Sequence, residues 1–463
     1  KLISSAKTLG IFQIESPGQR ELVGKSGIDD FEDVIADISL FRPGPVKSDM
    51  IRPYLDAKQG WRLPTYLHED LRPILSSTHG VVVYHEQVIE IIAQFTGCSF
   101  AEGDQARRAL GNFEEMAKTR SWFFARSLER GYSVRLIEQI WEVLEAFGSF
   151  GFCKAHAAAF ALPTFQSAWL KAHWPAHFLA GVLTHDPGMY PKRLLLDDAR
   201  QLGILVLPLD INASEKAYAV EKTNHGYGIR LALEEVKGIS SGEIDQILAS
   251  RRSGSPFASL SDFWQRATIS RPVVESLVLA GAFDQVHCIG EEHTRRRTQL
   301  TRRDLLLQVN DLEHLRRADK RAGIKRARGL PKNSGEIQSY QLTLDIGADQ
   351  QLSVGLPEMS AMERVRAELE VLGLDASRHV VDFYAEFLDL LGVTRSEQLL
   401  QTRNRAEVLV AGVKVATQTP PVRSGRRVIF LTLDDATGPV DATFFESVQG
   451  DCAATVFGSW LLL

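Results

Sequence analysis

The spacing of hydrophobic residues changes along the chain, and this change limits the folds that the chain can adopt. From residue 1 to about 210, apolar residues recur at helical intervals, as in 86–95 and 136–147, between short Gly and Pro breaks. After residue 405 the pattern becomes that of strands, in the runs 408–413, 427–433 and 440–445. The sequence therefore predicts a mostly α, multidomain protein that ends in a truncated all-β barrel of the OB type.

Length and composition divide the chain into several folded parts. With 463 residues, the chain is too long to fold around a single hydrophobic core. Its composition, with 44% hydrophobic and 24% charged residues, is that of a folded globular protein. We expect both ends to be cuts within a longer protein, because the chain starts without methionine and stops in an apolar run. The expected parts are a helical domain at 1–210, a helix-hairpin-helix module at 211–287, a basic linker at 288–360, a helical connector at 361–398 and a partial OB domain at 399–463.

The cysteines and the hydropathy pattern indicate a cellular compartment. Four cysteines occur far apart, without a C-x-x-C pair, so neither a zinc site nor a disulfide framework is predicted. The sequence contains no apolar run long enough to cross a bilayer and no export signal at its start. We therefore expect a protein of the reducing cytoplasm with no membrane partner.

Charge is distributed unevenly along the chain. The net charge is −5, so any contact with nucleic acid has to come from local basic surfaces. Between residues 295 and 328 there are twelve Arg and Lys against four Asp and Glu. This stretch predicts DNA binding that weakens with added salt.

Two neighbouring arginines, Arg107 and Arg108, lie at the edge of a helical segment. Guanidinium groups present paired donors that match phosphate oxygens, so the pair can clamp a polyphosphate. A solvated helix face is the alternative interpretation. The pair alone does not decide between them.

The stretch 147–156 combines glycines and aromatic residues with Lys154 and His156, just before an alanine-rich helical pattern. Glycines let the backbone approach a ligand, aromatic rings stack on bases, and cations at a helix start can meet phosphate. The alternative is a kinked helix junction whose aromatic residues belong to the core. Upstream, 41–45 reads as a rigid Pro-Gly-Pro turn with an architectural role.

A candidate DNA-backbone contact lies in the predicted hairpin module. Lys237, Gly238, Ser240 and Gly242 are placed where a helix-hairpin-helix turn aims backbone N–H groups at a phosphate without reading the base sequence. Glycines are common in helical turns, so the pattern is of modest specificity.

The sequence offers binding groups but no reaction centre. It lacks the H-E-x-x-H and G-x-x-x-x-G-K-[ST] motifs. A two-metal site on a strand prefers D-x-D spacing, which is also absent. The acidic pairs at 29–30, 197–198 and 434–435 are expected to be surface caps and turns. We therefore assign no catalytic residue and no metal ligand.

Several motifs, taken in order, carry a resemblance to a known family. The motifs lie at 10–16, 41–45, 84–88, 107–111, 150–156, 170–176, 207–212 and 279–284. Their order and spacing resemble the α subunit of bacterial DNA polymerase III, a C-family DNA polymerase. The likeness is strongest over residues 8–287, weaker to about 390, and returns at the barrel-like end.

The resemblance implies template-directed DNA synthesis, with template-primer DNA and deoxynucleoside triphosphates as partners. Arg107 and Arg108 match the family's phosphate-contacting arginines of the fingers, and Lys154 and His156 match its Gly-Phe-x-Lys-x-His motif at the nucleotide site. Mg²⁺ is expected for the full enzyme, held by palm carboxylates that belong upstream of residue 1. A chain without them is expected to be inactive alone.

The chain departs from the family pattern at two places. Asn112 and Phe113 follow Gly111 where the family usually has a lysine, which leaves one phosphate contact without a match. Ser240 stands where the hairpin tends to have a central glycine, which removes easy access to positive φ.

A sliding-clamp peptide is expected between the hairpin and the barrel. Gln341, Leu342 and Leu344 resemble a clamp-binding box without its terminal aromatic residue, and a plain linker strand is the alternative. The tail 370–379 looks like the family's helix before the barrel. Together these features favour the error-prone, damage-tolerant branch, with the sliding clamp and accessory translesion proteins as partners.

Two other functions remain open. The chain is alternatively a non-enzymatic module that binds DNA and docks on the clamp, or a degenerate paralogue that serves as a scaffold. A palm domain with D-x-D encoded upstream of residue 1 would distinguish a polymerase from the non-enzymatic module. DNA synthesis after that palm is restored would distinguish a polymerase from the scaffold paralogue.

Overall fold

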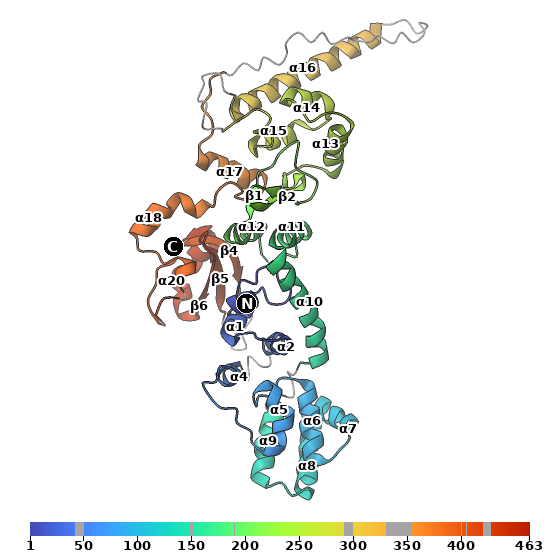
Figure 1. The fold of residues 1–463 in the computed structure, drawn as a ribbon, viewed down its shortest axis with the longest axis vertical. Coiled ribbons are helices and arrows are strands. Elements are labelled where there is room, and N and C mark those ends of the chain that lie inside the picture. The colour runs from blue at the N-terminus through green and yellow to red at the C-terminus, as the bar shows by residue number, and fades with distance from the viewer. Residues whose placement is uncertain are drawn as a thin grey trace. The chain divides into compact units, whose positions relative to one another are not determined.

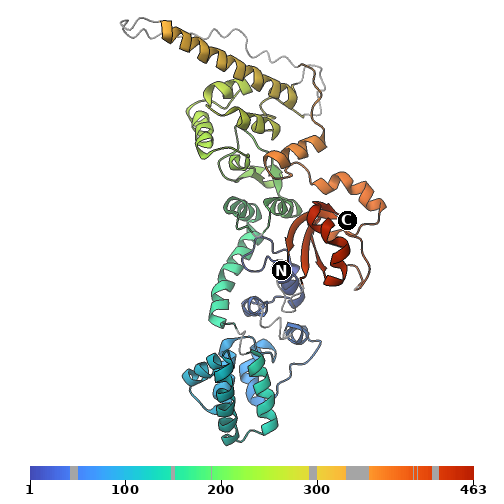
Figure 2. The same cartoon turned by 180° about the vertical axis from the view of Figure 1, so that it is seen from behind.

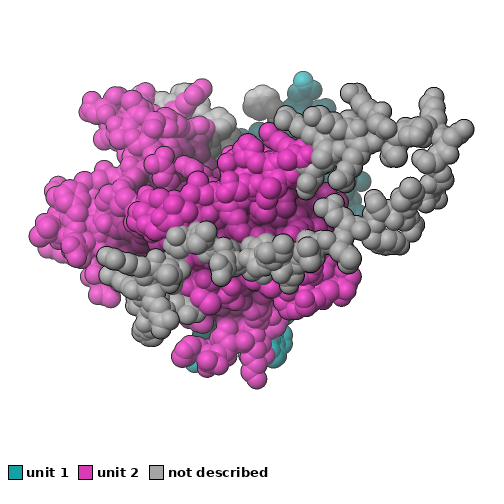
Figure 3. Space-filling model, turned by 90° about the horizontal axis from the view of Figure 1, so that it is seen from above, with its two compact units in different colours: residues 1–174 teal, residues 175–463 magenta. Residues whose placement is uncertain are grey.

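The protein forms two compact units in the computed structural model (Figure 3). The first is Lys1–Trp174 and the second is Pro175–Leu463. The structure describes residues 1–41, 51–147, 152–188, 190–290, 300–329, 354–399, 401–403, 405–419 and 427–463. The predicted nucleotide residues belong to the first unit and the predicted hairpin to the second.

The first unit is helical, as the apolar periodicity predicts (Figure 1). Its α-helices are α1 (Pro17–Ser26), α2 (Phe31–Leu40), α4 (Ile51–Lys58), α5 (Arg72–Leu75), α6 (His85–Thr96), α7 (Phe100–Ala109), α8 (Phe113–Glu129), α9 (Val134–Phe147) and α10 (Lys154–His173). One core lies among α1, α2 and α10, and a second lies among α6, α7, α8 and α9. The predicted helices at 86–95 and 136–147 are confirmed as α6 and α9.

The second unit contains most of the remaining helices and all the strands that the described residues form. Its α-helices are α11 (Pro175–His185), α12 (Lys192–Gln201), α13 (Ser241–Ser253), α14 (Leu260–Arg266), α15 (Arg271–Leu279), α16 (Arg302–Gly329), α17 (Ala361–Val371), α18 (Ala385–Leu390), α19 (Ser396–Leu399) and α20 (Glu446–Gly458). Among the helices described in either unit, none has both the length and the hydropathy needed to cross a membrane.

A small sheet in the second unit was not predicted. It consists of β1 (Leu205–Leu207), β2 (Ala219–Thr223) and β3 (Gly226–Arg230), in the order β1-β3-β2. β2 and β3 form an antiparallel hairpin, and β1 pairs with β3 in parallel. Position 228 favours glycine, because a Cβ there would lie 3.1 Å from the carbonyl oxygen of Leu205, closer than an ordinary van der Waals contact. Glycines weaken a strand pattern, which explains why this sheet escaped notice.

The C-terminal strands form an antiparallel sheet, seen from behind in Figure 2. They are β4 (Gly412–Gln418), β5 (Ile429–Asp434), β6 (Pro439–Phe444) and β7 (Leu461–Leu462), in the order β6-β5-β4-β7. The arrangement is compatible with part of a barrel. The strand predicted at 408–413 was placed too early, since β4 begins at Gly412 and Val408 and Leu409 are exposed. A run of apolar residues predicts that a strand is present but not the residues at which it begins and ends.

The acidic pairs differ in burial, and the prediction that they lie at the surface was wrong for two of the three. Asp30 accepts the N–H of Asp33 and caps α2 as expected. The pair at 197–198 on α12 and the pair at 434–435 at the end of β5 are at most 5% exposed, so they are not surface groups. Asp434 and Asp435 do stabilise a turn as predicted, because they accept backbone N–H groups between β5 and β6. Two adjacent acidic residues in a sequence do not indicate whether their side chains are buried, because burial depends on the elements that pack over them.

Candidate functional site

Arg107 and Arg108 lie in the last turn of α7, where the sequence placed them. Both are paired with Asp104: the Arg107 Nη2 is 2.9 Å from Oδ1, and the Arg108 Nη2 is 2.7 Å from Oδ2. The side chain of Arg108 is 73% exposed, whereas that of Arg107 is 21% exposed. The hydrogen bond from Arg107, with that from Arg108, holds the pKa of Asp104 below its usual value. The pair presents an exposed guanidinium with a displaceable partner.

The two helices α6 and α7 pack against each other as a hairpin. α7 starts just after the end of α6, and the backbone of Gly103 then touches α6 at Ile89, where a Cβ would lie 3.2 Å from the carbonyl oxygen. α6 and α7 therefore meet at Ile89 and Gly103, about one turn before the two arginines. Glycine at position 103 permits this close approach.

Lys154 and His156 lie in the first turn of α10. The Lys154 ammonium is 2.9 Å from a carboxylate oxygen of Glu32 on α2, and it lies 5.5 Å from the centre of the Tyr84 ring. The exposed imidazole of His156 packs between the rings of Phe152 and Phe160, at 5.4 and 4.3 Å between ring centres. Both side chains are at the surface, where a ligand can reach them.

The N-terminus of α10 is occupied by a carboxylate. Glu86, in the first turn of α6, accepts the backbone N–H of Lys154 at 2.9 and 3.0 Å and the thiol of Cys153 at 3.3 Å. Burial alone would raise the pKa of Glu86, but these donors outweigh it and the pKa is lowered. A phosphate at this helix start would thus rely on the Lys154 and His156 side chains rather than on this backbone N–H.

The start of α6 is joined to the start of α10, which carries Lys154 and His156. Tyr84 forms a parallel bridge with Phe152, and the N–H of His85 donates to the carbonyl of Phe152 at 2.9 Å. The beginning of α10 is therefore fixed to the beginning of α6. The predicted turn at 42–45, the glycines at 148 and 151, and Gln341, Leu342 and Leu344 of the clamp peptide lie outside the described residues.

The predicted hairpin turn has all four of its candidate residues at the surface. Lys237, Gly238, Ser240 and Gly242 are exposed, and Gly238 has a φ of +84°. Ser240 has an extended φ of −95° and caps α13, so this position does not need a glycine. The Lys237 N–H is already used by the carbonyl of Val371 at 2.8 Å. The backbone N–H of Lys237 is therefore occupied, whereas its ammonium remains exposed.

Glu243 joins this turn to the next one. Its carboxylate accepts the N–H of Ser240 at 3.0 Å and the N–H of Ser270, which precedes α15, also at 3.0 Å. Its pKa is lowered to about 2, because hydrogen bonds from Ser270 and Ser240 outweigh the effect of burial. The starts of α13 and α15 are thus fixed beside each other around one anion.

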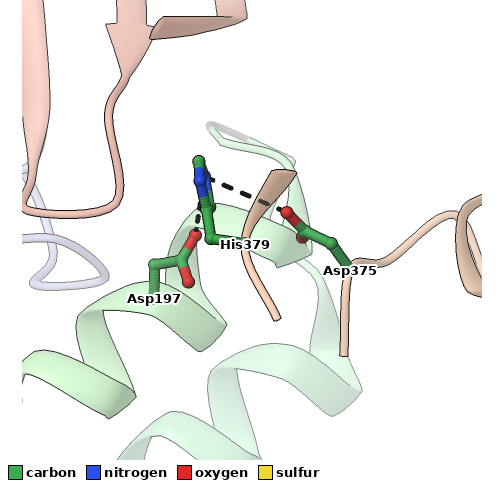
Figure 4. A group of neighbouring side chains, drawn as sticks. All are labelled: Asp197, Asp375 and His379. Carbon is green, nitrogen blue, oxygen red and sulfur yellow. Dashed lines mark ion pairs between the residues drawn. The ribbon is translucent and has the colours of Figure 1, made fainter. Parts of the chain in front are cut away.

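A buried group of acidic residues and a histidine connects three segments of the second unit (Figure 4). Asp197 lies on α12, and Asp375 and His379 follow α17; one donor atom of each lies within 4.8 Å of the others. The His379 Nε2 is 3.4 Å from Asp197, 3.9 Å from Asp375 and 3.5 Å from Asp434 of β5. Burial raises the pKa of Asp197 to about 8, and the charge of Asp434 adds to the rise.

This buried group does not fit a metal ion. The His379 Nδ1 accepts the N–H of Val381 at 3.1 Å, so the proton of a neutral ring is on Nε2, the atom that faces the carboxylates. A metal-bound imidazole needs the reverse, with the nitrogen away from the metal donating. Among the described residues, this is the one group with the spacing of a metal site. We therefore assign no metal ligand to the described part of the chain.

Comparisons with known proteins give the family. A model of the bacterial DNA polymerase III alpha subunit finger domain matches residues 1–131, and a model of the helix-hairpin-helix motif matches 203–298. An error-prone DNA polymerase of Symbiobacterium thermophilum is 35% identical over 97% of this chain and 42% of its own length. DNA polymerase III subunit alpha of Vibrio cholerae is 31% identical over 99% of this chain and 38% of its own length, and that of Escherichia coli is 32% identical over 96% and 37%. The chain is thus similar over nearly its whole length to bacterial DNA polymerase III alpha subunits and to an error-prone DNA polymerase.

The ranges matched by the two family models include some of the candidate residues. The chain spans about two fifths of the length of these curated relatives. The finger match contains Arg107 and Arg108, and the hairpin match contains 237–242, whereas Lys154 and His156 lie outside both matched ranges. The motif resemblance found in the sequence is thus confirmed at the level of the family.

Sequence reasoning missed the carboxylates that organise these sites. Ser240 and Glu243 have the Ser-x-x-Glu spacing of a capping box, a signal that was available in the sequence. Glu86 gives no such signal, because the backbone that it caps lies 68 residues farther along the chain. Glu32 is likewise matched to Lys154 only by the packing of α2 against α10.

Proposed function

We propose that this chain is part of a DNA-directed DNA polymerase of the error-prone, damage-tolerant branch, and that it binds nucleotide phosphates and template-primer DNA. The observation that carries the proposal is the similarity to DNA polymerases over 96–99% of the chain. Identity to an error-prone polymerase is 35%, against 31–32% for two replicative subunits, which favours that branch.

In this proposal the first unit receives the incoming nucleotide. Arg107 and Arg108 bind phosphate oxygens with charge-assisted hydrogen bonds, exchanging Asp104 for the ligand. Lys154 and His156 bind the same triphosphate from the start of α10. Support comes from the packing of α7 and of the start of α10 on the same helix, α6.

The second unit is proposed to bind the DNA backbone. The ammonium of Lys237 and the exposed turn around Gly238, Ser240 and Gly242 contact phosphates without base specificity. The antiparallel sheet β6-β5-β4-β7 is proposed as part of an OB-type barrel, and Gln341, Leu342 and Leu344 as the clamp peptide. The full enzyme is proposed to work in the cytoplasm, with translesion proteins as further partners.

Magnesium is proposed to act in the full enzyme through carboxylates outside this chain. Support comes from the described residues, in which the one group with metal-site spacing, around His379, has the wrong ring tautomer. The chain's own residues then bind, orient and neutralise the substrate rather than perform the chemical step.

Primer extension tests the proposal in two preparations. The product of the whole reading frame that encodes this chain should extend a primer with magnesium and nucleotides, and its Lys154→Ala variant should need far more nucleotide. The 463-residue chain alone should not extend the primer. Extension by the chain alone would show that the active centre lies within it.

A non-enzymatic DNA-binding and clamp-docking module is the second candidate, favoured by the four exposed residues of the hairpin turn. It predicts that the whole gene product binds duplex DNA but leaves the primer unextended. A degenerate scaffold paralogue gives no extension even when a palm with D-x-D is supplied.

A further inference from the structure

The surroundings of Lys154 are acidic rather than basic. Its ammonium is paired with Glu32 at 2.9 Å, and its own backbone N–H is held by Glu86. Glu90, one turn after Glu86 on α6, is close enough for its pKa to respond to both: burial raises it, the charge of Glu86 raises it further, and Lys154 lowers it. Lys154 thus has three carboxyl groups around it: Glu32 at its ammonium, Glu86 at its backbone N–H, and Glu90 within reach of its charge.

The three carboxyl groups are not equally replaceable. Glu86 is fixed by backbone donors and remains ionised, since its pKa is lowered. The side chain of Glu32 is 61% exposed, and that of Lys154 is 37% exposed. An ion pair this open contributes little and exchanges readily. Glu32 is therefore the member of the group that a ligand can move aside.

Glu32 is not needed to start its own helix. Asp30 and Asp33 form the capping box of α2, and Asp33 also accepts the N–H of Asp29 at 2.8 Å and pairs with Lys58. The first turn of α2 is thus satisfied without Glu32. Its carboxylate is paired with Lys154 instead, which makes a change at this position informative about the site.

We propose that Glu32, against the fixed charge of Glu86, makes the Lys154 site select the magnesium complex of a triphosphate over the free triphosphate. This inference rests on the proposed nucleotide site. Repulsion between a carboxylate and a ligand grows with the negative charge of the ligand. Magnesium cancels part of that charge, so the complex is repelled less than the free anion. Glu32 then acts as a specificity-determining residue, while Lys154 supplies the attraction.

The test is calorimetric titration of the chain and its Glu32→Gln variant with inorganic tripolyphosphate and dATP, each with magnesium or with a chelator, at low ionic strength. The variant should bind the metal-free ligands roughly two- to fivefold more tightly, the range set by an exposed charge pair. Binding of the magnesium complexes should change less, so the preference for the complex falls. The gain should shrink with added salt.

Glu21→Gln is the matched control, because Glu21 is an exposed glutamate on α1 paired with Lys25. It should leave all four affinities unchanged. An equal gain for free and complexed ligands in Glu32→Gln, or no gain, would overturn the inference while Lys154→Ala still lost binding. Unchanged binding by Lys154→Ala would instead overturn the proposed nucleotide site.

Discussion

The imidazole of His379 faces the carboxylate of Asp197 in the interior of the second unit, with Nε2 and Oδ2 3.4 Å apart. Neither side chain is more than 3% exposed. The contact links α12 to the segment after α17, and Asp434 extends the link to β5. Arg200 pairs with Asp197 and donates to the carbonyls of residues 375 and 376, which places a cation on the other side of the group.

Replacing Asp197 with Asn should flatten the dependence of stability on pH. The pKa of Asp197 is about 8 in the folded protein, above its ordinary 3.8, so the folded chain keeps a proton that the unfolded chain releases. The wild-type free energy of unfolding therefore falls as pH rises from about 4 to 8, by at most ~1.4 kcal/mol per pH unit for one proton. Urea unfolding at pH 6 and pH 8 should show a smaller fall in Asp197→Asn. The exposed Asp389→Asn is the control, and identical slopes in all three proteins would contradict the assignment.

Arg302→Ala should strongly destabilise the second unit. Arg302 binds Asp284 through Nε and Nη2, at 3.0 and 2.6 Å, and donates to the carbonyl of Leu279 at 2.7 Å. Its removal leaves the largely buried carboxylate unpaired, at a cost of about 3 kcal/mol. Thermal and urea unfolding measure the loss.

The next residue provides the control for that change. Arg303 pairs with Glu363 at the surface, with side chains 36% and 47% exposed. Arg303→Ala should cost less than about 1 kcal/mol. Equal losses for the two arginines would mean that burial of the Arg302 pair adds nothing.

Arg108→Ala should raise the apparent KM of the whole gene product for the nucleotide, with its affinity for duplex DNA nearly unchanged. Loss of a charge-assisted hydrogen bond predicts an effect of roughly tenfold or more. Primer-extension kinetics at varied nucleotide concentration measure it. Arg72→Ala, which removes an exposed arginine paired with Glu69, should leave the constant as it is. An unaltered constant in Arg108→Ala would remove Arg108 from the nucleotide site.

Lys237→Ala should weaken binding to duplex DNA of any sequence. One lost phosphate contact reduces the slope of log affinity against log salt by about 0.9. Fluorescence anisotropy across a range of salt concentrations measures both effects. Lys222→Ala, at an exposed position of β2, is the control. A slope that stays the same in Lys237→Ala would place the hairpin turn away from the DNA.

Helices were predictable from the sequence where one apolar face repeats over several turns, as in α6 and α9. The sheet of β1, β2 and β3 was not, because its strands are short and two glycines interrupt β3. The ends of β4 were misplaced for a related reason: hydrophobic residues continue before the strand, at positions that the fold leaves exposed.

In the candidate site, the sequence predicted the residues whose type and local motif already suggest phosphate binding, but not the partners that the fold brings to them. Arg107, Arg108, Lys154 and His156 are local signals, and the structure places them on α7 and α10 as the sequence indicated. Their acidic partners are set by packing between distant helices, which spacing in one sequence does not reveal. Asp197 and Asp434 were misjudged as surface groups for the same reason.

The hydrogen bonds from Lys154 to Glu86 also bear on the order in which the first unit assembles. They close a loop of the chain that contains α7, α8 and α9, so the opening turn of α10 gains its partner only after α6 has formed and the chain has returned. Kinetically, this turn should be among the last to acquire protection from hydrogen exchange. In evolution, any change in the length of the helices within the loop has to let both ends still reach the same carboxylate.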